Sequence, residues 1–413
     1  MLSILRFKLA GVALGVALLS VADIAPSVAF EDTPRALVDE AWQHVYREYV
    51  DRNFNQNDWM AVRESYLERD ITTPEQAHQV IAEMLRLLRD PFTRFLSPDN
   101  IRELENDTSG GFVGVGLTLS LDPITREWVV VKPIEGTPAE EAGLQPKDVI
   151  VSINGRFTSE IEPGRASSYA IGEVGSKVFL QVRRDRQLQQ YELVREAIEL
   201  NPLTYQVQST DMGKVGYIRL PSFTTKSPEA MKQAIQSLEA ESVRGYVLDL
   251  RGNPGGVLDS GIQIAQLWLE GGALISSLDH KGEREEFKAT APALTRKPLQ
   301  VLVDGESASA SEIVAAALQE NRRATIVGTQ TFGKGIVQIL EKMTDGSGLA
   351  ITVARYFTPK GNNIHRVGIR PDNVVQGDAS PSRNREGLPP EADLQYRRAL
   401  RNLRQSMRAE HLP

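Results

Sequence analysis

The sequence predicts a multidomain α/β protein with a helical N-terminal region, an inserted domain that resembles a small β-barrel, and an α/β core. Apolar residues recur at helical spacing before residue 110, short β-branched strands fill residues 111–197, and strand and helix patterns alternate from residue 198. Such alternation is typical of a largely parallel sheet covered by helices. The length of 413 residues suits two or three domains.

Composition excludes several kinds of function. The formal net charge of −7 and the pI near 5.5 argue against a nucleic-acid partner, which would favour a basic surface. The chain has 0 Cys, so it has no disulfide, no thiol nucleophile and no cysteine metal site. The histidines lack metal-ligand spacing, and we therefore expect neither a metal nor a cofactor. They are His44, His78, His280, His365 and His411.

The N-terminus predicts export. Arg6 and Lys8 precede an apolar run from Leu9 to Ala22, and small residues follow at Ser27-Val28-Ala29. This pattern is typical of a secretory signal peptide over residues 1–29 that is cleaved near Ala29. An uncleaved membrane anchor is the alternative, but the run is shorter than the roughly 20 residues that cross a bilayer.

Residues 30–110 are predicted to form helices that pack together. Leu37, Ala41 and Val45 recur at spacing near four, and Pro74 suits the first turn of a later helix. We interpret the aromatic residues of this region as packing core rather than as a cofactor site. They are Trp42, Tyr46, Tyr49, Phe54, Trp59 and Tyr66.

Residues 111–197 resemble a PDZ domain. Turn residues separate the short strands as in a half-open β-barrel, and the strand order is similar to the circularly permuted bacterial form. The resemblance implies that backbone N–H groups of Gly114-Val115-Gly116-Leu117 capture the C-terminal carboxylate of a peptide, which adds a strand to the sheet edge. Taken alone, Gly114 and Gly116 also fit a plain hairpin or bulge.

Residues 198–378 are predicted to form the α/β core. Functional sites in such sheets lie at the carboxyl ends of the strands, and two loops fall there. One is Asp249 to Gly256, and the other is a serine-rich turn from Asp304 to Glu312, between an apolar strand and a helix. Residues 379–413 form a polar tail, in which an Arg-rich helix near 393–408 is expected to be solvated.

The serine-rich turn is a candidate for nucleophilic catalysis, because a serine at a helix start lies beside free backbone N–H groups that suit an oxyanion hole. Two rival motifs fail. Residues 328–334 match the glycines and lysine of a phosphate-binding loop, but Gly335 replaces the required Ser or Thr, and residues 305–309 lack a glycine of the hydrolase elbow. Since no histidine lies in a motif resembling a triad partner, lysine is the base that remains.

Lys334 is the candidate base. A lysine must be neutral to accept a proton, and burial lowers the pKa of a lysine by several units. Phe332, Ile336 and the neighbouring glycines permit desolvation of Lys334, whereas Lys342 lies among acidic residues and is expected to be solvated. In a strand, Gln338 projects to the same face as Lys334 and can orient its amine.

Four segments resemble the C-terminal processing peptidases of the tail-specific protease family, which combine a PDZ domain with a Ser/Lys core. They are Leu248 to Gly256, Ser307 to Glu312, Thr331 to Gly335 and Val367 to Asp372. With the PDZ region, the resemblance spans roughly residues 33–378. In that family the nucleophile is the middle serine of an S-A-S-A-S run and the lysine follows 25 positions later, as Lys334 follows Ser309 here.

The resemblance also assigns roles to residues. They are Ser309 as acyl-forming nucleophile, Lys334 as general base, Gln338 as positioning partner of the lysine, and the backbone N–H groups of Gly255 and Ala310 as oxyanion hole. Gly256 is the alternative to Gly255. Ser307 is expected to hydrogen-bond within the turn, and Ser311 is expected to cap the helix.

Three N-terminal segments narrow the resemblance to one subfamily of these peptidases. Asp39 to Trp42, Tyr49 to Asn55 and Asp90 to Leu96 are similar to members in oxygenic phototrophs that remove the C-terminal extension of the photosystem II reaction-centre precursor. This implies a serine endopeptidase of the thylakoid lumen or periplasm, whose partners are protein C-terminal tails and which meets the membrane only through membrane-protein substrates. A general periplasmic tail-specific protease and a non-catalytic PDZ scaffold or chaperone are the alternatives. The retained nucleophile, base and positioning residue disfavour the scaffold.

Overall fold

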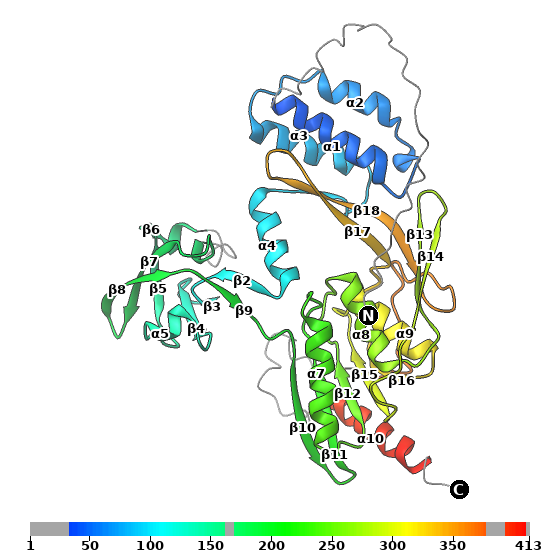
Figure 1. Cartoon of the computed structure of the whole chain (residues 1–413). Helices are drawn as coiled ribbons and strands as arrows, with labels where there is room; N and C mark the ends of the chain where they lie inside the picture. Colours follow the sequence, from blue (N-terminus) through cyan, green and yellow to red (C-terminus); the bar gives the residue numbers. More distant parts are fainter. Residues whose placement is uncertain (1–32, 162–168, 377–392, 410–413) are drawn as a thin grey trace, which may run out of the picture.

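The computed structural model of the chain describes residues 33–161, 169–376 and 393–409 (Figure 1). The predicted signal peptide and its cleavage site near Ala29 lie outside the described residues. In the described part, no helix is both long enough and apolar enough to cross a membrane.

The N-terminal helices cover one face of an antiparallel sheet. They are α1 (Pro34–Glu48), the 3₁₀ turn η1 (Phe54–Gln56), α2 (Trp59–Leu67) and α3 (Pro74–Arg86). Thr73 begins α3 with a capping box, in which its hydroxyl accepts from the N–H of Gln76 and the Gln76 side chain accepts from the N–H of Thr73. The predicted aromatic core is confirmed, because these aromatic residues pack in one buried cluster, except for Tyr46, which is 40% exposed.

This antiparallel sheet joins the N-terminal region to the core. Its strands are β1 (Arg94–Leu96), β18 (Gly348–Phe357), β13 (Ala273–Asp279) and β14 (Arg284–Lys288), hydrogen-bonded in this order, with β17 (Ile336–Lys342) also paired with β18. Phe95 of β1 lies opposite Leu349 of β18. A hydrogen bond from Gln338 of β17 to the carbonyl of Phe92 follows from this pairing. Segments about 250 residues apart in sequence are therefore neighbours here.

A two-stranded ribbon carries the β-rich domain, which Figure 1 shows to one side of the core. After α4 (Pro98–Ser109), β2 (Gly111–Gly114) pairs antiparallel with β9 (Glu196–Glu199). The elements between them are β3 (Leu117–Leu121), β4 (Trp128–Pro133), α5 (Pro138–Glu141), β5 (Val149–Ile153), β6 (Arg156–Phe157), the 3₁₀ turn η2 (Thr158–Glu160), β7 (Lys177–Arg184) and β8 (Gln187–Val194). The sheet order β3-β4-β5-β7-β8 leaves β3 at an edge, where an extended peptide can pair.

The α/β core is a six-stranded sheet with helices on its faces. Its strands, in spatial order, are β10 (Thr204–Thr210), β11 (Gly213–Arg219), β12 (Tyr246–Asp249), β15 (Leu299–Val303), β16 (Ala324–Gly328) and β19 (Asn373–Val374). Only the β10–β11 pair is antiparallel among these. The helices α7 (Ser227–Ala240), α8 (Leu258–Trp268) and α9 (Ala310–Glu320) share one large buried core with the sheet. The carboxyl ends of β12 and β15 carry the two loops singled out in the sequence.

The C-terminal helix α10 (Leu394–Ala409) departs from the expectation of a solvated helix. Its apolar residues recur every three or four positions and form one buried stripe. They are Tyr396, Ala399, Leu403 and Met407, which pack against Val215, Val247, Leu302 and Val327 of the core sheet. The expectation was wrong because the many arginines of α10 mask a narrow apolar face that covers the sheet.

Candidate active site

The predicted nucleophile lies in a strained strand-to-helix turn. β15 ends at Val303, α9 begins at Ala310, and Ser309 between them has φ 55° and ψ −114°. For a residue with a side chain, this backbone conformation lowers the stability of the fold by of order 1–3 kcal/mol, so surrounding contacts must maintain it. The N–H of Ala310 has no acceptor within the described chain. Strain beside a free N–H is typical of a nucleophile with an oxyanion donor next to it.

The glycine-rich loop (residues 250–256) packs against this turn. A Cβ on Gly255 would lie 2.7 Å from Ser309 Cβ and 3.1 Å from the nitrogen of Ala310, and the φ of Gly255 is +101°. The N–H of Gly255 donates to Asn253 Oδ1 at 2.9 Å. The N–H of Gly256 has no acceptor in the described part of the chain, although Gly256 forms an isolated parallel bridge with Phe223. Gly255 lies directly against Ser309, and Gly256 has an N–H group without an acceptor, so both glycines stay candidates for the second oxyanion donor.

Ser307 and Ser311 tie the serine-rich turn to the glycine-rich loop. The Ser307 hydroxyl donates to the Leu250 carbonyl at 2.8 Å and accepts a hydrogen bond within the turn, as predicted. Ser311 does not cap the helix, because Ser309 occupies the N-cap position. The Ser311 hydroxyl instead donates to the Asn253 carbonyl at 2.9 Å.

A buried carboxylate joins the nucleophile to the candidate base. Glu312 is 0% exposed, and its Oε2 accepts from the backbone N–H of Ser309 at 2.9 Å and of Lys334 at 2.8 Å. Its Oε1 accepts from the Gly333 N–H at 2.7 Å and from the Thr331 hydroxyl at 2.6 Å. One side chain thus fixes the backbone at both residues, and the sequence analysis did not assign it this role.

Lys334 lies on an aromatic surface in partly buried surroundings. Its Nζ is 5.4 Å from the centre of the Phe92 ring. Burial lowers the pKa of Lys334 below its ordinary value, the positive charge of Arg94 lowers it further, and the negative charge of Asp90 opposes both. No carboxylate lies within ion-pair distance of the amine among the residues that the structure describes. The predicted desolvation is present, and the neighbours that tune it come from a distant segment.

Gln338 has a different hydrogen-bond partner from the one expected. Its Nε2 donates to the Phe92 carbonyl at 2.6 Å. The expected alternation fails because Lys334 precedes β17 and a register shift separates Val337 from Gln338. In this conformation no hydrogen bond joins Lys334 to Gln338 or to Ser309 within the described residues. The Gln338 amide oxygen still has acceptor capacity, so its positioning role stays a prediction.

The predicted carboxylate loop joins β2 to β3, with Gly114 as the last residue of β2 and Leu117 as the first residue of β3. Val115 is buried, and its carbonyl accepts from the Ala139 N–H, whereas the N–H groups of Val115 and Gly116 have no protein acceptor in the described ranges. Gly116 has φ +82°, and a Cβ there would lie 2.1 Å from the Thr137 hydroxyl oxygen. The loop therefore combines free donors with a glycine that its packing requires.

Comparisons with known proteins give the family. A model of peptidase family S41 matches residues 214–375, and a PDZ domain model matches residues 129–184. The chain is 40% identical over 387 residues to a carboxyl-terminal-processing protease of Synechocystis sp., covering 93% of this chain and 90% of that protein. The chain belongs to the carboxyl-terminal-processing proteases of peptidase family S41.

Further relatives of this S41 peptidase come from chloroplasts. It is 37% identical over 348 residues to the chloroplastic carboxyl-terminal-processing peptidase 2 of Arabidopsis thaliana, covering 81% of this chain and 68% of that protein. A solved structure of a photosystem II D1 C-terminal processing protease is 35% identical with a TM-score of 0.57, and the match covers 83% of this chain and 93% of that chain. The predicted multidomain fold, with its PDZ domain and protease core, is confirmed, and the protein is a serine-type peptidase.

The S41 peptidase also has site neighbours that sequence reasoning missed. Besides Glu312, they are Phe92 and His365, whose rings meet edge to face with centres 6.0 Å apart. The only sequence signal for Phe92 was its place in a segment that resembles the family. Lys342 is solvated as predicted, because its side chain is 63% exposed and paired with Glu105. In the described ranges, no cluster of acidic, histidine or cysteine side chains is arranged to hold a metal ion.

Proposed function

We propose that this S41 peptidase cleaves protein substrates near their C-termini with Ser309 as nucleophile and Lys334 as general base. The observation that carries the proposal is Glu312, which accepts from the backbone N–H groups of both residues and so fixes their separation. The strained backbone of Ser309 and the close approach of Gly255 add to it. None of these features is needed for a serine that only begins a helix.

The reaction follows from these groups. Neutral Lys334 takes the proton of the Ser309 hydroxyl as its oxygen attacks the scissile carbonyl carbon, and the resulting oxyanion lies at the N–H groups of Ala310 and of Gly255 or Gly256. The lysine ammonium then gives its proton to the leaving amine, so the peptide bond breaks and an acyl-enzyme forms. A water molecule, deprotonated by the same lysine, hydrolyses the ester and regenerates the serine.

The structure represents a resting conformation in this proposal. Lys334 Nζ lies over Phe92 rather than against Ser309, and its four-carbon chain must turn toward the serine for the reaction. Gln338, held by the Phe92 carbonyl, then offers its amide oxygen to the amine. We infer that substrate binding brings these side chains together.

The substrate side of the proposal rests on the family. We infer that the PDZ loop of residues 114–117 binds the substrate carboxylate and that the physiological substrate is the precursor of the photosystem II reaction centre. Relatives from cyanobacteria and chloroplasts, and the D1 processing protease among the similar structures, support this. The same relatives support export to the thylakoid lumen or periplasm. A general tail-specific protease would cleave unrelated apolar tails as fast as the precursor tail, and parallel kinetics on both peptides tests this.

The mechanism is tested with purified wild type, Ser309→Ala and Lys334→Ala on a peptide with a free, apolar C-terminus. Both variants should lose at least about a thousandfold in kcat, because a nucleophile or its base is removed. Lys342→Ala is the matched control and should cleave like wild type, since Lys342 is a solvated lysine of the same strand region. Equal cleavage by wild type and Ser309→Ala would refute the mechanism. Peptide binding without any turnover by wild type would favour the scaffold.

A further inference from the structure

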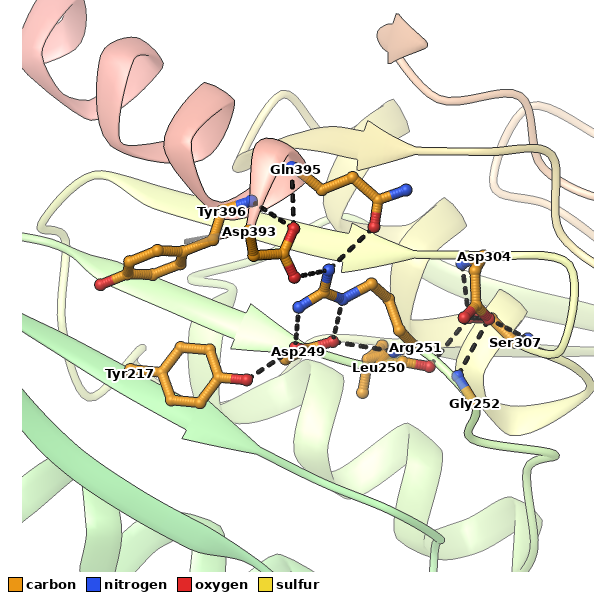
Figure 2. A network of polar contacts seen from close by, with 10 residues as sticks. All are labelled: Tyr217, Asp249, Leu250, Arg251, Gly252, Asp304, Ser307, Asp393, Gln395 and Tyr396. Carbon is orange, nitrogen blue, oxygen red and sulfur yellow. Dashed lines mark hydrogen bonds and ion pairs between the residues drawn. The ribbon is translucent and has the colours of Figure 1, made fainter. Parts of the chain in front are cut away.

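A buried arginine links the C-terminal helix to the glycine-rich loop (Figure 2). Arg251 is 3% exposed, and its guanidinium lies between Asp249 at the end of β12 and Asp393 at the start of α10. Its Nε and Nη2 donate to Asp249 at 2.8 and 2.5 Å. Its Nη1 donates to Asp393 and, at 2.9 Å, to Gln395 Oε1. Two elements far apart in sequence therefore share one cation.

The charges of this cluster depend on one another. Burial alone would raise the pKa of Asp249, but the Arg251 guanidinium and the Tyr217 hydroxyl hold that pKa below its ordinary value. Burial alone would lower the pKa of Arg251, and the carboxylates of Asp249 and Asp393 raise it instead. Removing one partner leaves a buried charge incompletely compensated, so the remaining groups must move or admit water.

The backbone on both sides of Arg251 holds the serine-rich turn. Three consecutive contacts connect the two loops, and two of them appear in Figure 2. They are Ser307 Oγ to the Leu250 carbonyl at 2.8 Å, the Gly252 N–H to Asp304 Oδ1 at 2.9 Å, and the Ala308 N–H to the Asn253 carbonyl at 3.0 Å. A shift of Arg251 is thus transmitted to the backbone that carries both Gly255 and Ser309.

α10 has docking contacts besides the ion pair with Arg251. Its buried stripe packs on the core sheet, and Asn402 donates to Gln300 Oε1 at 2.9 Å. Asp393 also caps the helix, since its Oδ1 accepts from the Gln395 N–H at 2.8 Å. We therefore expect α10 to stay folded when the contact of Asp393 with Arg251 is weakened.

We propose that Asp393 and Gln395 are positioning residues for catalysis, which hold Arg251 and, through it, the glycine-rich loop beside Ser309. The proposal rests on the proposed function, in which this loop supplies an oxyanion donor. Such donors act only when they are held close to the position of the developing charge. The C-terminal helix thus supports the active site from the face of the core sheet opposite to α9.

The test compares full-length wild type, Asp393→Asn and Gln395→Ala. Asn still caps a helix and nearly preserves the shape of Asp, so Asp393→Asn removes the charge while α10 stays docked. We expect kcat per titrated active site to fall by about tenfold in Asp393→Asn and less in Gln395→Ala, with KM within about twofold of wild type. The rate of acylation by a small serine-directed inhibitor should fall in parallel, because it uses the same oxyanion hole.

Arg404→Ala is the control on the same helix, because Arg404 pairs with Asp211 at the surface, away from the loop. It should keep the wild-type kcat and Tm. An unchanged kcat per titrated site in Asp393→Asn would overturn the positioning role, as would a loss that disappears when activity is counted per folded molecule. Cleavage by Ser309→Ala would instead overturn the proposed function, so the two failures are distinguishable.

Discussion

The lowered pKa of Lys334 predicts how the rate of cleavage depends on pH. Burial and the charge of Arg94 lower the pKa of Lys334 below 10.5, with Asp90 opposing them. In the proposed mechanism only the neutral amine can accept the Ser309 proton, so kcat/KM should rise with pH and level off above the lysine pKa in the free enzyme. Rates measured from about pH 5 to 10 should show a midpoint below 10.5. A profile that falls throughout this interval would contradict the assignment of Lys334 as base.

Arg94→Gln provides the matched variant for this profile. Arg94 is exposed, so the substitution should leave the fold intact. Removing a positive neighbour favours the protonated lysine and should shift the midpoint upward by roughly half a pH unit at low salt, and less at high salt. A midpoint that stays in place at low salt would show that the charge of Arg94 does not contribute to the lowered pKa of Lys334.

The hydrogen bonds of Glu312 predict that its substitution lowers both activity and stability. In Glu312→Gln, an amide NH₂ replaces one carboxylate oxygen. It then faces backbone N–H groups that donated hydrogen bonds to the carboxylate. Each buried donor left without an acceptor costs about 1–3 kcal/mol. We expect kcat to fall at least about tenfold with a smaller change in KM, together with a lower Tm.

Glu320→Gln is the control for Glu312→Gln. Glu320 lies on the same helix but bonds to surface groups, including the Lys360 N–H at 2.7 Å. It should leave kcat unchanged. Wild-type kinetics in Glu312→Gln would show that the shared carboxylate does not set the geometry of the site.

Sequence reasoning named candidates for the reacting residues but missed most of their surroundings. Ser309 and Lys334 were chosen by local motif, by elimination of histidine and by family resemblance, and these signals need no tertiary structure. Phe92 and Glu312 act through contacts across the fold, at separations that no periodicity reveals. The partner of Gln338 was missed for a related reason, because a register shift in β17 moves its side chain out of the assumed alternation.

At the scale of elements, the glycine-rich loop gives the next prediction. A Cβ in Gly255→Ala would lie 2.7 Å from Ser309 Cβ and 2.8 Å from the Ala308 carbonyl oxygen, at a φ that side chains rarely adopt. The loop must move away from the nucleophile, and kcat should fall about a hundredfold or more. Gly271→Ala is the control, since a Cβ there meets nothing within 4 Å. Full activity in Gly255→Ala would contradict the close approach of loop and serine.

The elements themselves were largely predictable where one pattern dominates. The helices of residues 33–104 and the alternating strands and helices of the core follow from periodicity and capping. The buried environment of α10 could not be predicted in the same way. Its arginines dominate the sequence, and only a stripe of four apolar residues covers the sheet. Pairing of β1 with β18 was equally hidden, since strand partners far apart in sequence leave no local signal.

At the scale of the whole molecule, the PDZ domain and the catalytic core are connected through the ribbon of β2 and β9. The ribbon begins directly after α4, whose last turn contacts the core where the Thr225 N–H donates to the Thr108 carbonyl at 2.9 Å. In the proposed function, the PDZ domain recognises the substrate and the core cleaves it, so recognition and cleavage are separate steps on one chain. Each step can be measured alone if one of them is blocked.

Amidation of the substrate C-terminus blocks only the proposed recognition step. The free N–H groups of Val115 and Gly116 would lose a charged acceptor, and hydrogen bonds to charged groups contribute about 1.5–3 kcal/mol each. We expect kcat/KM for the amidated peptide to fall at least about tenfold. Calorimetry with full-length Ser309→Ala separates binding from turnover, and it should detect the free-acid peptide but not the amide. Equal binding of the two peptides would show that the carboxylate is not what the loop recognises.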